Sequence, residues 1–194
     1  NDAKQLKSQL PLYKLAALSA YYNTGSSVSY GRAVGGNATD RALLDYFLPF
    51  GENLSCKKAE MIEFDSARKF SAVHITGQFD LHLVKGAPER ILPGCTHFYD
   101  SAGISQPFNN KNQLERIWHE RAGRTERVIA LAVSPSPITE DGSFSRLILI
   151  GLMCIRDEIR PEAAKAMLDE AGIVDGDGDG YRELDGKNID ISIV

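Results

Sequence analysis

Alternation of apolar and polar residues predicts a β-hairpin near the middle of the chain, with arms at 70–76 and 79–85. Both arms are rich in valine, isoleucine, phenylalanine and leucine, and Thr76-Gly77-Gln78 supplies the turn between them. Three further strands are predicted from apolar runs, at 57–64, 127–133 and 144–155. The last of these contains nine consecutive residues without a polar side chain, which is typical of a central strand buried on both faces.

Helical spacing of apolar residues appears at the start of the chain. Residues 2–22 carry leucines and alanines at this spacing, and Pro11 is predicted to start a second helix there. The glycine-, serine- and asparagine-rich stretch 23–36 is predicted to be a loop. Asn37 or Thr39 can then cap the next helix. The apolar face of that helix is formed by Leu43, Leu44, Phe47 and Leu48.

A later helix is predicted over 109–123, with Leu114, Ile117 and Trp118 on its apolar face. This spacing favours Trp118 as a core residue rather than a platform for a ligand. A short helix is also predicted after Gly86. A strand-rich middle with helices before it and in the crossover indicates an α/β fold of the α+β type. Its sheet is expected to be twisted, mainly antiparallel and flanked by helices.

Composition is that of an ordinary globular protein. The 194 residues are 43% hydrophobic and 25% charged, which is enough to bury a core in one largish domain. A net charge of −4 argues against a general nucleic-acid binder. Three cysteines without CxxC spacing indicate reduced, structural thiols. The longest apolar run has nine residues, so we expect no membrane crossing by this chain.

The stretch from Phe64 to Glu89 carries the candidate chemistry. It begins with an aromatic ring near the basic pair Arg68-Lys69, and it ends by delivering Lys85 into Gly86-Ala87-Pro88. Glycine permits close backbone approach, and proline can open a short helix. A stacking ring, cations and free amide groups at one sheet face suit a nucleotide with a phosphate tail. The alternative is a surface hairpin whose lysines and arginines are solvated.

Five motifs occur in the order of one known family. They are FDSARK at 64–69, KGAPE at 85–89, GNATDRAL at 36–43, RVIALA at 127–132, and the stretch from Gly151 that ends in RDEIRPE. Together they resemble the nucleotide-binding domain of P-type cation-transporting ATPases, particularly the calcium-pump-like branch, over roughly residues 1–171. The resemblance implies a nucleotide-binding domain at 1–160. Residues 161–194 would then be either the start of a hinge and phosphorylation domain or an appended tail.

The resemblance also implies how the base is held. Phe64 corresponds to the adenine-stacking aromatic, and Lys85 to a lysine at the back of the pocket, where Gly86 and Ala87 let the base approach. Asp40 corresponds to an acid, usually Glu, that helps to hold the adenine edge. Because Asp is shorter, a water molecule would bridge the contact. From the residues alone, an acid in the first turn of a helix simply complements the helix dipole.

For the phosphates, the resemblance implies two cations, Lys69 and Arg127. The sequence contains neither the Asp-Lys-Thr-Gly-Thr motif that the family phosphorylates nor its magnesium-binding Thr-Gly-Asp loop, and Gly-Asp-Gly occurs only inside the Asp/Gly tract at 175–180. Phosphoryl transfer needs the acceptor and the metal to be positioned together. We therefore expect this chain to bind ATP without hydrolysing it.

The implied parent protein is an ATP-driven cation transporter. In it this domain would lie at the cytoplasmic face of a membrane, bind Mg-ATP and present the γ-phosphate to the phosphorylation domain. The implied partners are the phosphorylation, actuator and transmembrane domains. The transported ion is chosen by membrane residues that this sequence does not contain.

The last part of the chain departs from the family. Residues 174–186 read VDGDGDGYRELDG, which is similar to the Asp/Gly loop of extracellular peptide-binding proteins of ABC importers. The segment also half-matches an EF-hand. The predicted calcium ligands are Asp175, Asp177 and Asp179.

The EF-hand match fails at position 12, where Gly186 stands in place of the bidentate Glu, so Glu183 or Asp185 would have to substitute. The alternative is an Asp-Gly turn that joins a helix to a strand at 189–194. If the loop does bind calcium, the alternative function of the chain is a calcium-stabilised binding module related to solute-binding proteins.

Overall fold

The structure is a computed structural model that describes residues 12–51, 54–123, 126–156, 161–177, 182–184 and 187–189. It divides into two units, Asn1–Arg156 and Asp157–Val194, which are described separately. The predicted domain boundary at residue 160 falls in the stretch 157–160, which lies outside the described residues. That boundary stays a prediction.

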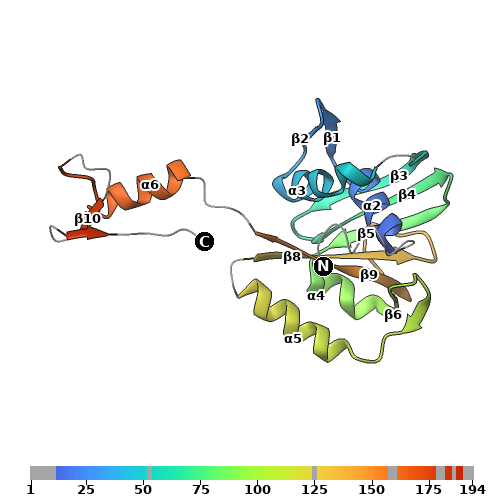
Figure 1. Ribbon diagram of the computed structural model, residues 1–194. Coiled ribbons are helices and arrows are strands. Elements are labelled where there is room, and N and C mark those ends of the chain that lie inside the picture. The colour runs from blue at the N-terminus through green and yellow to red at the C-terminus, as the bar shows by residue number, and fades with distance from the viewer. Residues whose placement is uncertain are drawn as a thin grey trace. The chain divides into compact units, whose positions relative to one another are not determined.

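The first unit is built on a seven-stranded sheet (Figure 1). In spatial order its strands are β3 (Cys56–Asp65), β4 (Phe70–Gly77), β5 (Leu81–Gly86), β8 (Glu126–Ser134), β9 (Leu147–Arg156), β6 (Cys95–Tyr99) and β7 (Ser105–Pro107). The pair β6–β9 is parallel, and the other neighbouring strands in this sheet are antiparallel. The predicted hairpin is the β4–β5 pair, with His74 opposite His82. The mainly antiparallel α/β fold expected from the sequence is confirmed.

Helices cover both faces of this sheet (Figure 1). They are α2 (Leu12–Tyr22), α3 (Ala38–Phe47), the short α4 (Pro88–Ile91) and α5 (Lys111–Ala122), with 3-10 turns at Leu48–Phe50 and Leu92–Gly94. Because strand side chains alternate between faces, neighbours such as Ala72 and Val73 enter two different cores. Val73 packs with α2 and α3 in one core, and Ala72 packs with Ile91 of α4 in the other.

The central strand is β8 rather than β9. Seven of the nine residues of β8 are buried, whereas in β9 burial is confined to Leu147, Leu149 and Ile150. The prediction of a two-side-buried strand over 144–155 was therefore wrong for its second half. The reason is that β6 pairs with β9 only at residues 147–149, so within the described sheet the rest of β9 has a strand neighbour on one side only.

The predicted loop at 23–36 contains a small hairpin instead. Strands β1 (Ser26–Ser29) and β2 (Arg32–Gly35) pair antiparallel, and the two residues between them, Tyr30 and Gly31, have φ of 48° and 73°. Positive φ at both central positions is the geometry of a tight hairpin turn. The helix that follows is capped by Asn37, whose side chain accepts a hydrogen bond from the backbone N–H of Asp40 at 2.8 Å.

The second unit contains α6 (Pro161–Glu170) and the antiparallel strands β10 (Arg182–Leu184) and β11 (Lys187–Ile189). Arg182 of β10 forms an ion pair with Asp169 of α6 at 2.7 Å. Of the strand predicted at 189–194, residues 190–194 lie outside the described part. In the described part of the chain, no helix combines the length and the apolar character needed to cross a membrane.

Candidate functional site

A pocket of about 560 Å³ lies where the ends of β3 and β5 meet the beginnings of β8, α3 and α4 and the side of α5. It contains all of the residues predicted to hold a nucleotide: Asp40, Phe64, Lys69, Lys85, Gly86, Ala87 and Arg127. They come from four segments that are far apart in the sequence. The fold therefore brings the predicted nucleotide residues to one place.

The turn after β3 positions two of these residues. Phe64 is the second-last residue of β3, and its side chain lines the pocket while the residue stays 54% exposed. The carboxylate of Asp65 accepts hydrogen bonds from the backbone N–H groups of Ala67 and Arg68, at 2.9 and 3.0 Å. These bonds lower the pKa of Asp65. The turn ends at Lys69 with φ of 58°, which leads the chain back into β4.

Gly86 is required by contact between strands. A Cβ atom at this position would lie 2.5 Å from the carbonyl oxygen of Lys69 and less than 3 Å from the backbone of Phe70. The same Lys69 carbonyl accepts a hydrogen bond from Ala87 N–H at 3.0 Å. From the sequence, Gly86 was expected to let the base approach the backbone closely. The structure adds a backbone reason that holds without any ligand.

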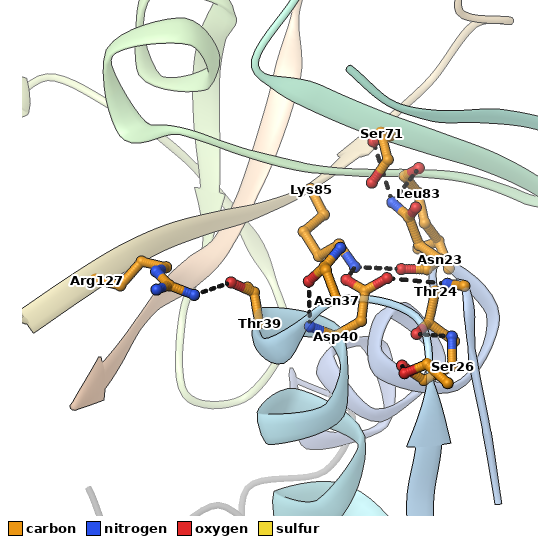
Figure 2. Close-up of polar contacts among 12 residues, drawn as sticks. Asn23, Thr24, Ser26, Asn37, Thr39, Asp40, Ser71, Leu83, Lys85 and Arg127 are labelled. Carbon is orange, nitrogen blue, oxygen red and sulfur yellow. Dashed lines mark hydrogen bonds and ion pairs between the residues drawn. The ribbon is translucent and has the colours of Figure 1, made fainter. Parts of the chain in front are cut away.

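The back wall of the pocket is a buried ion pair between Lys85 of β5 and Asp40 of α3, with 4% and 6% of each residue exposed. The Nζ atom of Lys85 lies 2.5 Å from Oδ1 of Asp40 and also donates to the carbonyl oxygen of Asn23 (Figure 2). The other carboxylate oxygen, Oδ2, accepts from Gly25 N–H at 2.9 Å. Burial lowers the pKa of Lys85, and the Asp40 carboxylate opposes that shift.

This ion pair was not predicted from the sequence. Asp40 does lie in the first turn of α3, where it complements the helix dipole as expected. Its carboxylate, however, is tied to Lys85 and to the turn after α2, so its contacts are tertiary rather than local. A second lysine supports the same turn, because Lys58 of β3 donates to the carbonyl oxygen of Thr24 at 2.9 Å.

Two exposed cations flank the pocket. Arg127, the second residue of β8, donates from Nη1 to the hydroxyl of Thr39 at 2.7 Å, which places it beside the first turn of α3 (Figure 2). Lys69 pairs with Glu89 of α4 at 3.0 Å, and both side chains are about half exposed. Exposed ion pairs of this kind contribute little to stability. Lys69 can therefore leave Glu89 and pair with another anion at a small cost in free energy.

The surroundings of Trp118 of α5 were predicted only in part. It packs against the core that contains Phe70, as expected, but it also lines the pocket. Its indole Nε1 is buried, with no hydrogen-bond partner in the described structure. Ile117, predicted on the same apolar face, is 47% exposed. Together with Ala122, Val128 and Ile129, Trp118 gives the pocket an apolar wall that sequence reasoning missed.

In the second unit, carboxylate oxygens of Asp175, Asp177 and Glu183 lie within 4.8 Å of one another. Oε2 of Glu183 accepts from the backbone N–H of Gly176 at 2.8 Å, which fixes this side chain over the loop. Glu183, one of the two residues expected to substitute for the missing Glu, thus lies beside Asp175 and Asp177. Asp179 and Asp185 lie outside the described residues. Calcium binding in this loop stays a prediction.

Comparison with known proteins gives consistent matches. The family described as "P-type ATPase, cytoplasmic domain N" matches residues 11–162. Calcium-transporting ATPase PAT1 of Dictyostelium discoideum is 34% identical over 152 residues, which is 72% of this chain and 14% of that protein. Calcium-transporting ATPase 1 of Yarrowia lipolytica is 29% identical over 180 residues, which is 86% of this chain and 19% of that protein.

A potassium-transporting relative matches as well. Potassium-transporting ATPase alpha chain 2 of Cavia porcellus is 30% identical over 160 residues, which is 70% of this chain and 15% of that protein. The chain therefore spans less than one fifth of the length of the relatives it matches.

Proposed function

Because this chain belongs to the family of P-type ATPase cytoplasmic N domains, we propose that its 560 Å³ pocket binds ATP. The observation that carries this proposal is that all residues implied in nucleotide binding line this one pocket. Its volume lies within the range of ordinary small-molecule sites, roughly 300–1,000 Å³.

The residues present fit a nucleotide. The half-exposed ring of Phe64 offers a face for stacking on the base, and the apolar wall that includes Trp118 and Ile129 lines the same pocket. Lys69 and Arg127 supply positive charge for the phosphate chain. Lys85 supplies a buried donor at the back of the pocket. These residues bind and orient the nucleotide.

At the level of the whole protein, we propose an ATP-driven cation transporter, because the relatives are named calcium- and potassium-transporting ATPases. In it, this domain would present the γ-phosphate of Mg-ATP to a phosphorylation domain on the cytoplasmic side of a membrane. An actuator domain and a transmembrane domain complete the proposed set of partners.

The chain by itself should bind ATP weakly and leave it intact. Its sequence has no Asp-Lys-Thr-Gly-Thr motif, so the acceptor carboxylate for phosphoryl transfer is missing from it. An open pocket without a partner domain over the phosphates should bind at about millimolar level, which corresponds to about 4 kcal/mol. The family's magnesium-binding Thr-Gly-Asp loop is absent from the sequence, so binding should not depend on magnesium.

The single tryptophan provides the test. Trp118 lines the pocket, so its fluorescence should change as ATP is added and saturate at about millimolar ATP, with or without magnesium. A parallel assay should find no phosphate release that scales with protein concentration. Isothermal titration calorimetry is the second measurement of binding. If the fluorescence does not change and calorimetry shows no binding isotherm, the proposed binding is wrong. Steady phosphate release that survives removal of contaminating ATPases would contradict the prediction that the chain does not hydrolyse ATP.

A further inference from the structure

His74 and His82 form a cross-strand pair on the β4–β5 hairpin. The two residues are directly opposite each other in the register, and their imidazole rings stack with centroids 4.2 Å apart and planes 26° from parallel. Opposite residues of an antiparallel pair project from the same face of the sheet. The next pair along the hairpin, Val73 and Leu83, is buried, so the backbone that carries the two rings is fixed by the core.

A carboxylate orients one of the two rings. Nε2 of His74 lies 2.7 Å from Oδ1 of Asp80, the residue just before β5. An ionised carboxylate can only accept a hydrogen bond, so Nε2 carries the proton, and in the neutral ring Nδ1 keeps its lone pair. Histidines that bind a metal usually donate their other ring nitrogen to a carboxylate or carbonyl in this way. The contact between His74 and Asp80 therefore has the form of the outer shell of a metal site.

The second ring is prepared as a ligand by its surroundings. Burial lowers the pKa of His82, and the neighbouring His74 lowers it further, whereas Asp80 and Glu60 oppose the shift. The imidazole of His82 is therefore mostly uncharged at neutral pH. Only the neutral ring has a nitrogen lone pair that a metal ion can bind.

The histidine pair opens into a pocket of about 340 Å³ that shares no lining residue with the proposed nucleotide pocket. Glu60 of β3, opposite His74 on the neighbouring strand, lines it together with Glu140. Glu140 forms an exposed ion pair with Arg68 at 3.8 Å. Of the described residues that line this pocket, none is a lysine or an arginine. The hollow thus combines two imidazoles with carboxylates.

This donor set favours a transition metal. Zn²⁺ binds four ligands drawn from imidazole nitrogen, carboxylate oxygen and water, whereas Ca²⁺ and Mg²⁺ are bound by oxygen. In the described part of the chain, three ligand atoms lie within 4.8 Å of one another only in the Asp/Gly loop. At the histidine pair two nitrogens are provided, and the rest of the coordination shell has to come from the exposed side chain of Glu60 or from water.

We propose that His74 and His82 chelate a divalent transition-metal ion of the zinc type on the outer part of the β4–β5 hairpin, with Asp80 as a positioning residue that orients His74. The site requires neither the nucleotide pocket nor the Asp/Gly loop. The other explanation of the same contacts is a ring stack and an ion pair that serve the hairpin alone.

Titration of the full chain with Zn²⁺, without nucleotide, distinguishes the two explanations. Imidazole C–H and backbone amide resonances of His74 and His82 should shift together at the lowest zinc concentrations, and an excess of Ca²⁺ should not reverse these shifts. The measurement needs no substitution, so it does not depend on how well a variant folds. Zinc shifts confined to other histidines or to residues 175–177, with none at His74 and His82, would overturn the proposal.

Substitutions provide the matched comparison. His74→Ala and His82→Ala should each weaken zinc binding at least about tenfold by calorimetry, because each removes a ligand from the metal. His97→Ala, on β6 of the same sheet and outside this pocket, should leave the dissociation constant unchanged within about twofold. His82→Gln keeps more of the side-chain bulk and replaces His82→Ala if the alanine variant melts early. Unchanged zinc binding in a folded variant that lacks both His74 and His82 would contradict the assignment.

Discussion

Phe64 and Arg127 line one pocket but act through different forces, so single substitutions can separate base recognition from phosphate recognition. Phe64→Ala should weaken ATP, ADP and AMP by similar factors, about 1–3 kcal/mol, because stacking acts on the base. Little salt dependence is expected. The residue is 54% exposed, so melting should be unchanged. If the folded variant binds all three nucleotides normally, the adenine does not stack on this ring.

Arg127→Ala should discriminate between nucleotides. It removes an exposed charge worth about 0.2–1 kcal/mol. Because this charge faces the phosphate chain, the binding of ATP should weaken more than the binding of AMP. The difference should shrink as salt rises, because exposed charges are screened over about 8–10 Å. Titrations at low and high salt measure it. Arg116→Ala, an exposed arginine of α5 outside the pocket, is the control and should change neither nucleotide. Equal losses for ATP and AMP would contradict the assignment.

Tyr13 provides a pH test of the core. Burial raises its pKa to about 12, with help from Tyr21 and Tyr46, and its buried hydroxyl has no hydrogen-bond partner in the described structure. A raised pKa contributes stability that is complete below the ordinary value of 10.0 and is lost as pH rises toward about 12. Tyr13→Phe should therefore lose less stability than wild type between pH 10 and pH 12.

At neutral pH the same variant should be as stable as wild type or more stable, by up to about 1–3 kcal/mol, because an unpaired buried hydroxyl is costly. Denaturant unfolding at neutral and alkaline pH measures both effects. Tyr30→Phe, at a fully exposed position, should follow the wild-type curve. Parallel curves for Tyr13→Phe and wild type above pH 10 would count against the burial of this ionisation.

At the scale of elements, Gly86 lies where β5 packs closely against the end of the turn after β3. Gly86→Ala should destabilise the protein by about 1–3 kcal/mol, because its Cβ would lie 2.5 Å from the Lys69 carbonyl oxygen. Gly151→Ala, on β9 of the same sheet, meets nothing within 4 Å and should change stability little. Thermal or denaturant unfolding compares them. Equal stability of the two variants would show that the strands approach less closely than described.

The Asp/Gly loop of the second unit has its own test. If Asp175, Asp177 and Glu183 hold calcium, the ion should raise the melting temperature and protect the loop from protease, by an amount that grows with free calcium. Asp177→Asn should reduce both effects. The first unit should be unaffected. A chelator that leaves melting and proteolysis unchanged would make the segment an ordinary turn.

Elements with strong local periodicity were predictable from the sequence, and those that depend on distant pairing were not. The β4–β5 hairpin was found because its residues alternate and a glycine turn separates them. The β1–β2 hairpin was missed, because its strands are short and Tyr30 adopts a positive φ that is uncommon for tyrosine. The burial of β9 was overestimated, because the extent of its pairing with β6 is set by contacts far along the chain.

The same division holds for the candidate site. Motif order pointed to the residues that the fold gathers around the pocket, but not to their contacts with one another. Lys85 and Asp40 are 45 residues apart, and Arg127 and Thr39 are 88 apart. No local pattern encodes such pairs. The part played by Trp118 was missed because helical spacing shows which face is apolar, not what lies beyond it.

For the whole molecule, the family match covers residues 11–162, which includes the sheet, its helices and the complete pocket. The Asp/Gly loop of the second unit lies outside that match. Nucleotide binding and calcium binding are thus assigned to different parts of the chain, so each can fail without the other. The central claim is that the pocket of the first unit is the nucleotide site.

Backbone amide shifts recorded during a titration of the wild-type chain with ATP test that claim most directly. We predict progressive shifts for the amides of Phe64, Lys85, Ala87 and Arg127, which line the pocket, with half-saturation at about millimolar ATP. Amides of residues 175–177 should not move. Shifts confined to those loop residues, or none at the pocket when ATP is in excess, would contradict the assignment of this pocket as the nucleotide site.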